Sequence, residues 1–224
     1  MTSAPMQSRI VPLLHDRKVA LLSIDLQYLD AAPGFGLFSE IDPRNIPESY
    51  VYYFEQLRCT VLPHVRRLQG CFRKAGFEVM HARICSLTRD GRDRSAGHKR
   101  LGLHAVPGSK DAEILAEVAP MEDEIVFDKT TSGVFTGTNL AVVLRNLDIR
   151  TLVVAGVYTN ECVSTTVRDA CDLGFDAIVV EDACTTLSKV LHEGAISVLR
   201  DRYALVIRTD ELIEGVRKVK PVAL

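Results

Sequence analysis

Six short apolar runs alternate along this chain with segments of helical periodicity, and this alternation constrains the fold more than any other feature. The runs are rich in β-branched residues, as buried strands are. They span Lys18–Asp25, Phe77–Ile84, Glu124–Lys129, Thr151–Gly156, Asp176–Asp182 and Tyr203–Thr209. Because strands that alternate with helices form βαβ units, we predict one α/β domain over residues 1–224. It has three α/β/α layers and a six-stranded, mostly parallel sheet.

The helical segments show where their ends lie. In one of them, Val65, Leu68 and Phe72 mark an apolar face and Gly76 is placed to end the helix. In another, which follows the fourth apolar run, Gly174 has the same position. We therefore expect helices that stop just before these two glycines.

Composition and charge exclude several classes of protein. The 224-residue chain has a formal net charge of −2, with both signs mixed along its length. This balance favours neither a nucleic-acid nor a membrane partner. No apolar run reaches the length of a membrane-spanning helix, and the first 14 residues do not have the pattern of a signal peptide. We therefore expect a cytoplasmic protein whose partner is a small molecule.

The cysteines are scattered and form no C-x-x-C pair or zinc-finger spacing. They are Cys59, Cys71, Cys85, Cys162, Cys171 and Cys184. Such a set is typical of reduced thiols, most of which pack as small buried hydrophobic residues. Cys171 lies on the apolar face of a predicted helix, and we expect it in the core.

Three reactive side chains follow the carboxyl ends of three predicted strands. Asp25 ends the first strand, Lys129 ends the third, and Cys162 lies just beyond the fourth. In open α/β sheets the carboxyl ends of the strands line the ligand-binding crevice. The sequence therefore predicts that the three side chains converge there.

Cys162 also lies at the predicted start of a helix. Thr159 or Asn160 is suited to cap that helix, which would place the thiol in the first turn. The free N–H groups and the positive end of the helix dipole favour a thiolate there. We therefore expect a lowered thiol pKa and a nucleophilic sulfur.

Three segments of the sequence resemble the signature segments of the isochorismatase-like cysteine hydrolases. They are "LLSIDLQ", "DKTTSGVF" and "GVYTNECVSTTVRDACDLGF", in the family's order and spacing, and the resemblance runs from about Lys18 to Val216. It implies the Rossmann-like fold of that family and a catalytic triad of Asp25, Lys129 and Cys162. It also implies a homo-oligomer, dimeric or tetrameric.

The resemblance further implies how the substrate oxygen is held. A cis peptide bond is expected between Val157 and Tyr158. The backbone N–H groups of Tyr158 and Cys162 are expected to form an oxyanion hole. Other candidate substrate-binding residues lie beside these segments: Gln27, Phe135 and Asn160.

The presence of Cys162 places the resemblance in the amidase branch of the family. The isochorismate hydrolases lack this cysteine. The nicotinamidases carry a metal site of the form D-W-H followed by a second histidine, and this chain has His81 and His98 without that pattern. We therefore predict no metal and no cofactor. The predicted activity is release of ammonia from a small urea-type amide, triuret or biuret first, through a covalent thioester. The alternative within the family is a ureidoacrylate or N-carbamoylsarcosine amidohydrolase.

Two interpretations from other classes remain open at this stage. The chain could be a non-catalytic interaction protein with a structural Cys162, or a redox protein in which Cys171 or Cys184 approaches Cys162. The long segment 85–109 is also open. Its basic residues either bind an anionic group or form surface ion pairs with Asp90 and Asp93. They are Arg89, Arg92, Arg94, Lys99 and Arg100.

Overall fold

A six-stranded parallel sheet forms the centre of the molecule. The structure is a computed structural model that describes residues 6–14 and 18–219. The first five residues, on which the signal-peptide expectation partly depends, lie outside this part. The strands are β1 (Val19–Ile24), β2 (Glu78–Ile84), β3 (Ile125–Lys129), β4 (Thr151–Val157), β5 (Asp176–Thr185) and β6 (Leu205–Ile207), and their order in the sheet is β3-β2-β1-β4-β5-β6. All neighbouring pairs are parallel.

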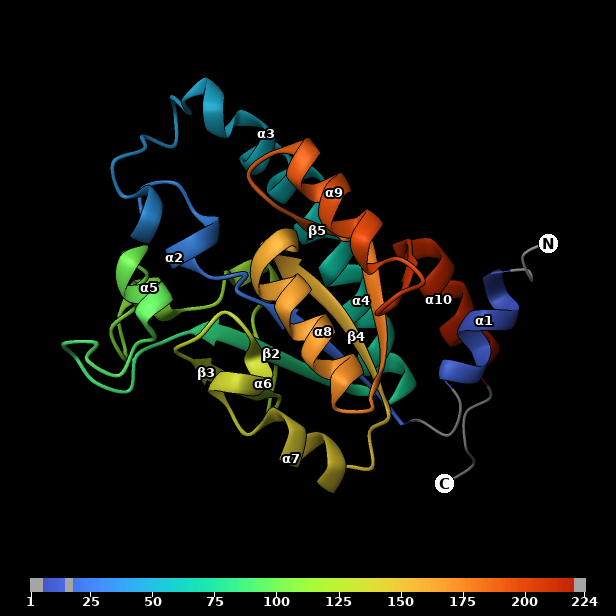
Figure 1. Ribbon diagram of the computed structural model, residues 1–224. Helices are drawn as coiled ribbons and strands as arrows, with labels where there is room; N and C mark the ends of the chain where they lie inside the picture. The colour runs from blue at the N-terminus through green and yellow to red at the C-terminus, as the bar shows by residue number, and fades with distance from the viewer. Residues whose placement is uncertain (1–5, 15–17, 220–224) are drawn as a thin grey trace.

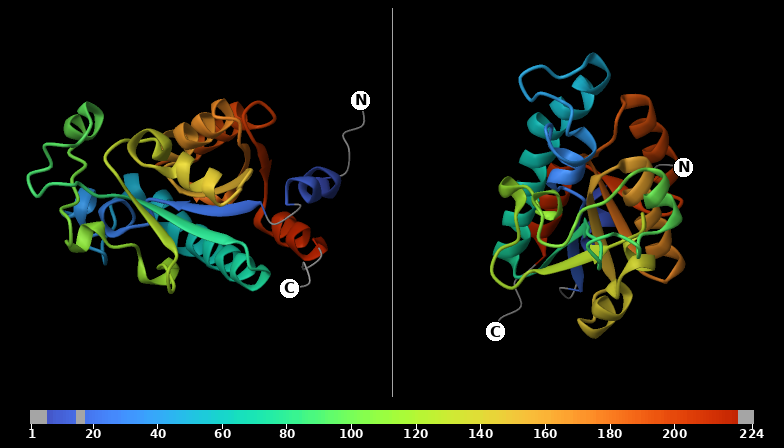
Figure 2. Two further views of the ribbon diagram at one scale, coloured as in Figure 1. Left: turned by 90° about the horizontal axis from the view of Figure 1, so that it is seen from below. Right: turned by 90° about the vertical axis from the view of Figure 1, so that its left-hand side faces the viewer.

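Helices cover both faces of this sheet (Figures 1 and 2). One face carries α1 (Met6–Leu13), α3 (Glu48–Gln56), α4 (Leu62–Ala75) and α10 (Thr209–Lys218); the other carries α6 (Val134–Gly137), α7 (Leu140–Asn146), α8 (Ser164–Asp172) and α9 (Lys189–Leu199). Alternate strand residues serve the two cores: Leu21 and Val153 pack on the first face, and Leu22 and Val154 on the second. The predicted three-layer α/β/α fold is confirmed.

Shorter elements gather beyond the carboxyl edge of the sheet. They are α2 (Tyr28–Ala31), α5 (Ala96–Arg100) and the 3₁₀ turns Gly36–Phe38 and Lys110–Ala112; a further 3₁₀ turn, Ala116–Val118, lies beside α4, where Gln69 donates to the Val118 carbonyl. A small third core lies beneath them and includes Leu29, Ile84 and Leu103. This core fixes the segments that follow β1 and β2 over the strand ends.

The predicted ends of the two helices are confirmed. Gly76 follows α4 in the left-handed conformation, with φ of 68°, and its N–H bonds the Arg73 carbonyl. Gly174 lies just beyond α8 with φ of 86°. Glycine tolerates this conformation because it has no Cβ.

Gly156 is the glycine on which the site depends most. Its φ is 119°, and a Cβ at this position would collide with the Ile24 carbonyl oxygen of the neighbouring central strand. The register between β4 and β5 also shifts at this point, between Val154 and Gly156. The close approach of the two strand ends therefore requires glycine.

Replacement of Gly156 by alanine should destabilise the protein by about 2–4 kcal/mol, because the Cβ collides with backbone and the conformation disfavours any L side chain. Urea unfolding followed by circular dichroism measures this difference. The matched control is Gly194→Ala in α9, where a Cβ meets nothing within 4 Å. It should be neutral or stabilising by up to about 1 kcal/mol. Equal effects of the two substitutions would contradict the assignment.

Candidate active site

Asp25, Lys129 and Cys162 meet at the carboxyl edge of the sheet. Asp25 follows β1, Lys129 ends β3, and Cys162 follows β4. The Lys129 Nζ lies 2.9 Å from Asp25 Oδ2 and 3.4 Å from Cys162 Sγ. All three side chains are buried; the thiol-bearing residue is 4% exposed and the other two are fully enclosed. The structure thus brings together the three residues that the sequence placed at strand ends.

The local backbone turns these side chains toward one another. Asp25 adopts the left-handed conformation, with φ of 54°, while its N–H still bonds the Ala82 carbonyl of β2 at 2.9 Å. Aspartate tolerates this region better than most residues, and such conformations are common at functional sites. The strand therefore ends at Asp25, and its side chain leaves the sheet's alternating pattern.

Lys129 remains a cation despite its burial. Burial opposes the charge, but attraction from Asp25 and Cys162 outweighs it, so the pKa of Lys129 is raised. The Nζ also donates to the Thr131 carbonyl at 3.1 Å. Since a buried charge needs partners, these contacts keep one positive charge at the centre of the cluster.

The expectation of a lowered thiol pKa is wrong for the resting protein. Burial raises the pKa of Cys162 well above its usual value; Lys129 lowers it, whereas the charge of Asp25 raises it again. The start of the helix favours a thiolate, but the loss of water around the buried sulfur outweighs that effect. The thiol is therefore protonated at rest, and a base must activate it.

Asp25 is the base within reach. Burial raises its pKa, and the attraction of Lys129 offsets part of that effect. One lysine cation can balance one anion, so Asp25 and Cys162 hold a single proton between them. Transfer of that proton to Asp25 leaves a thiolate 3.4 Å from the Lys129 ammonium. The cluster can therefore generate a nucleophile without changing its net charge.

The helix that carries Cys162 begins differently from the prediction. A π-helical turn, Thr159–Val163, precedes α8, and its cap is Tyr158 without a side-chain hydrogen bond. Thr159 Oγ1 instead pairs with His192 Nδ1 at 2.9 Å. The predicted capping role of Thr159 or Asn160 is therefore wrong, because both side chains bond the segment that follows β5.

Val157 and Tyr158 are joined by a cis peptide bond, as the resemblance implies. The side chain of Tyr158 is held within the protein: its hydroxyl donates to the Asp30 carbonyl at 3.2 Å, and its ring centroid lies 5.3 Å from that of Tyr53. These contacts favour a backbone role for Tyr158 over a catalytic role of its hydroxyl. Its assignment to the oxyanion hole with Cys162 stays a prediction.

Gln27 is fully buried and bonded to the backbone. Its amide nitrogen donates to the carbonyls of Ile84 and Asp111 at 2.9 and 2.8 Å, and its amide oxygen accepts from the Ile84 N–H at 2.6 Å. These bonds tie the segment after β1 to the end of β2. The structure thus favours a positioning role for Gln27 over the predicted contact with substrate.

Phe135 and Asn160, the other two residues predicted to bind substrate, lie in different surroundings. The ring of Phe135 stacks on Phe175, 5.7 Å away, and Phe175 precedes β5 at the opposite edge of the sheet. Phe135 therefore packs, partly buried, against the second core, and its predicted contact with substrate stays a prediction. Asn160 is partly exposed beside Cys162, and its Oδ1 accepts from the Thr186 hydroxyl at 2.5 Å.

Three further titratable residues near the cluster were not assigned to the site from the sequence. Asp30 and His98 are both 1% exposed, and Asp30 Oδ1 and both ring nitrogens of His98 have no hydrogen-bond partner among the described residues. Glu161 adjoins Cys162 and is more exposed. Burial raises the pKa of both carboxyl groups and lowers that of His98 to about 4. The only sequence signal for Asp30 was an acid within the apolar stretch after β1.

The structure also decides the exposure of Cys171 and the partners of two arginines in the segment 85–109. Cys171 is exposed, so its predicted core position is wrong. In the segment 85–109, Arg92 pairs with Asp90 at 3.1 Å, whereas Arg94 donates to the Leu103 carbonyl at 3.0 Å. The structure therefore supports the ion-pair interpretation for Arg92. In the described part of the chain, no cluster of three or more His, Cys, Asp or Glu could hold a metal ion.

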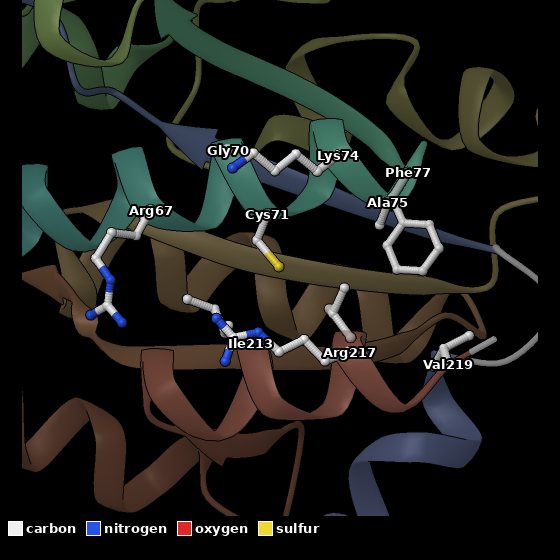
Figure 3. Close-up of a pocket in the computed structure, with 10 residues that line it drawn as sticks. Arg67, Gly70, Cys71, Lys74, Ala75, Phe77, Ile213, Arg217 and Val219 are labelled. Carbon is white, nitrogen blue, oxygen red and sulfur yellow. The ribbon is translucent and has the colours of Figure 1, made fainter. Parts of the chain in front are cut away.

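A separate cavity lies between α4 and α10 (Figure 3), and none of Asp25, Lys129 and Cys162 lines it. Its volume is about 430 Å³, and Arg67, Lys74 and Arg217 contribute charged side chains to it. Cys71 points from α4 toward α10 in this cavity, and burial raises the pKa of its thiol. Since no carboxylate or imidazole is among the residues that line this cavity, whereas Asp25 and Lys129 accompany Cys162, we place the chemistry at Cys162.

Comparison with known proteins identifies the family. Residues 20–211 match the isochorismatase domain. The chain is 31% identical to the ureidoacrylate amidohydrolase RutB of Acinetobacter baylyi over 89% of this chain and 84% of that protein. The identity with N-carbamoylsarcosine amidase of an Arthrobacter species is 31%, over 69% of this chain and 61% of that protein. The chain therefore belongs to the isochorismatase family.

Other matches extend this result. The chain is 33% identical to the uncharacterized isochorismatase family protein YrdC of Bacillus subtilis, and the match spans 48% of this chain and 63% of that protein. A crystal structure of an isochorismatase family protein from Desulfovibrio vulgaris superposes with a TM-score of 0.73 at 27% identity, covering 91% of this chain and all of that one. Fold and sequence thus agree on the family.

The raised thiol pKa has a direct consequence for alkylation. We expect the iodoacetamide reaction rate at Cys162 to keep rising with pH beyond 9, since thiolate forms only there. Replacement of Lys129 by methionine should shift this profile to still higher pH, because it removes the charge that lowers the thiol pKa. Peptide mass spectrometry must follow Cys162 itself, since Cys59 and Cys171 are exposed. The control is Lys74→Met on the surface of α4. A rate that levels off below pH 9 would contradict this account.

Proposed function

We propose that the protein is a cysteine-dependent amidohydrolase that releases ammonia from a small urea-type amide, with triuret or biuret ahead of other carbamoyl compounds. The observation that carries this proposal is the buried cluster in which one lysine cation contacts both a carboxylate and a thiol. Family members named for ureido and carbamoyl amides support the class of bond. The preference for triuret or biuret rests on the resemblance of the sequence.

The geometry supports a two-step reaction. Asp25 takes the thiol proton, and the Cys162 sulfur attacks the amide carbonyl to form a C–S bond. Backbone N–H groups at Tyr158 and Cys162 hold the oxyanion, which in comparable sites contributes about 3–4 kcal/mol per donor. Asp25 then gives the proton to the nitrogen, the C–N bond breaks and ammonia leaves. The acyl group remains on sulfur as a thioester.

Water completes the cycle. Asp25 takes a proton from a water molecule, whose oxygen attacks the thioester, and the C–S bond breaks. The product leaves as a carbamic acid and the thiol regains its proton. For a substrate R–NH–CO–NH₂ the balance is addition of one water and release of one ammonia. Lys129 stays protonated throughout and stabilises each anion of the cycle in turn.

Several alternatives are tested by the same assay. Ureidoacrylate and N-carbamoylsarcosine are the alternative substrates, and a non-catalytic or redox protein would release ammonia from none. The interaction and redox interpretations both lack a reason for Asp25 and Lys129 beside the thiol. A cytoplasmic location and a homo-oligomer, dimeric or tetrameric, remain predictions; none of the described helices is long and apolar enough to cross a membrane.

Ammonia release should be lost when the triad is altered. Cys162→Ser and Asp25→Asn should each lower kcat at least about a hundredfold, because loss of a nucleophile or its base normally costs orders of magnitude. A coupled ammonia assay across biuret, triuret, ureidoacrylate, N-carbamoylsarcosine and nicotinamide measures this. Cys71→Ser, in the cavity between α4 and α10, is the matched control and should retain activity. A Cys162→Ser protein with more than about a hundredth of wild-type activity would remove the nucleophile assignment.

Activity should not depend on a metal ion. The proposed steps use only the side chains of Asp25, Lys129 and Cys162 and the two backbone N–H groups. Dialysis against a strong chelator should therefore leave kcat within experimental error of the untreated protein. A loss that zinc, manganese or iron restores would show that a metal takes part in catalysis.

A further inference from the structure

His98 is a buried histidine whose ring has no partner. It lies on α5, is 1% exposed, and neither Nδ1 nor Nε2 has a hydrogen-bond partner among the described residues. A neutral imidazole carries one N–H donor and one acceptor nitrogen. Buried polar groups are almost always hydrogen-bonded, so two unpartnered atoms on one ring need an explanation such as a bound ligand.

The surroundings of His98 place it beside the catalytic cluster. The N–H of Ser95, where the turn into α5 begins, bonds the Thr130 carbonyl next to Lys129. Lys129 and Arg94 are the charged groups whose field acts on the ring. The Arg94 guanidinium is itself bonded to the carbonyls of Gly91 and Leu103. The ring therefore lies within the field of the catalytic lysine, and burial with these cations, which lower its pKa to about 4, keeps it neutral.

Asp30 is the second buried group with an unpartnered polar atom among the described residues, and it lies on a different helix from His98. It lies on α2 and is 1% exposed, and its Oδ1 has no hydrogen-bond partner among the described residues. Its backbone carbonyl accepts from the hydroxyls of Tyr53 and Tyr158, and the second of these bonds ties Asp30 to the side chain of the residue that follows the cis peptide bond. The charges that act on its carboxyl are those of Asp25, Lys129 and Glu161.

Burial and the neighbouring charges together decide whether the Asp30 carboxyl group is protonated. Lys129 is the cation of the cluster and is already paired with Asp25. Burial and the neighbouring Asp25 carboxylate raise the pKa of Asp30 far above its usual range. A protonated carboxyl group offers an O–H donor and a carbonyl acceptor side by side. His98 and Asp30 together therefore present donors and acceptors without net charge.

We propose that His98 and Asp30 recognise the part of the substrate that stays on sulfur after ammonia leaves, and that they select an uncharged acylurea over a carbamoyl compound bearing a carboxylate. This inference rests on the proposed amidohydrolase function. An acylurea supplies N–H donors and carbonyl acceptors that match both groups. A substrate carboxylate would instead lie near Asp25, Asp30 and Glu161.

The first experiment changes the protein. His98→Leu and Asp30→Leu should each raise KM for biuret at least about tenfold while kcat falls less, whereas Asp30→Asn should stay within about threefold of wild type. Asparagine keeps a neutral donor and acceptor. Gly97→Ala, on α5 where a Cβ has ordinary contacts, is the control. Unchanged KM in both leucine variants, or equal damage from asparagine and leucine, would overturn the inference.

The second experiment changes the ligand and needs no turnover. N-carbamoylglycinamide and N-carbamoylglycine differ only in an amide against a carboxylate. Protection of Cys162 from iodoacetamide gives their dissociation constants. Wild type should bind the amide at least about tenfold more tightly, and this ratio should collapse in His98→Leu and Asp30→Leu. Tighter binding of the carboxylate would overturn the inference. Binding of these ligands without ammonia release from any amide would instead overturn the proposed function.

Discussion

The buried contact between Lys129 and Asp25 is the interaction on which the site depends. The two charged atoms are 2.9 Å apart and both side chains are fully enclosed. Removal of one partner from such a pair typically costs about 3–5 kcal/mol, because the other charge is left uncompensated. The pair also sets the protonation of everything near it. Cys162 stays a thiol and Asp30 stays neutral because burial raises both pKa values and the neighbouring acids add to this, so that the one Lys129 cation does not outweigh them.

The parallel sheet brings Asp25 and Lys129 together because both residues lie at the carboxyl ends of strands. Parallel strands bring their carboxyl ends to one edge, so three residues far apart in the sequence need only short exits to meet. Gly156 lets β4 approach the end of β1, and the left-handed turn at Asp25 redirects its side chain. Gln27 then fastens the segment beyond β1 to β2 through backbone hydrogen bonds. The site is thus built on rigid elements.

Features that depend on local sequence periodicity and on the positions of strand ends could be predicted from the sequence. Six strands, the helix stops at Gly76 and Gly174, and the meeting of Asp25 with Lys129 follow from local pattern. Properties set by the surroundings did not follow: the thiol pKa depends on loss of water, and the exposure of Cys171 depends on how α8 packs. His98 and Asp30 were missed because an unpartnered buried atom is visible only when all of its neighbours are placed.

The most direct test of the account is a search for the acyl group on Cys162 during turnover. Acid quenching of the protein with biuret within milliseconds, followed by peptide mass spectrometry, should show an adduct on the Cys162 peptide. Its mass should equal that of the substrate less ammonia, and hydroxylamine should remove it. Ammonia release at full rate with no such adduct, under conditions that preserve a thioester, would contradict covalent catalysis by Cys162.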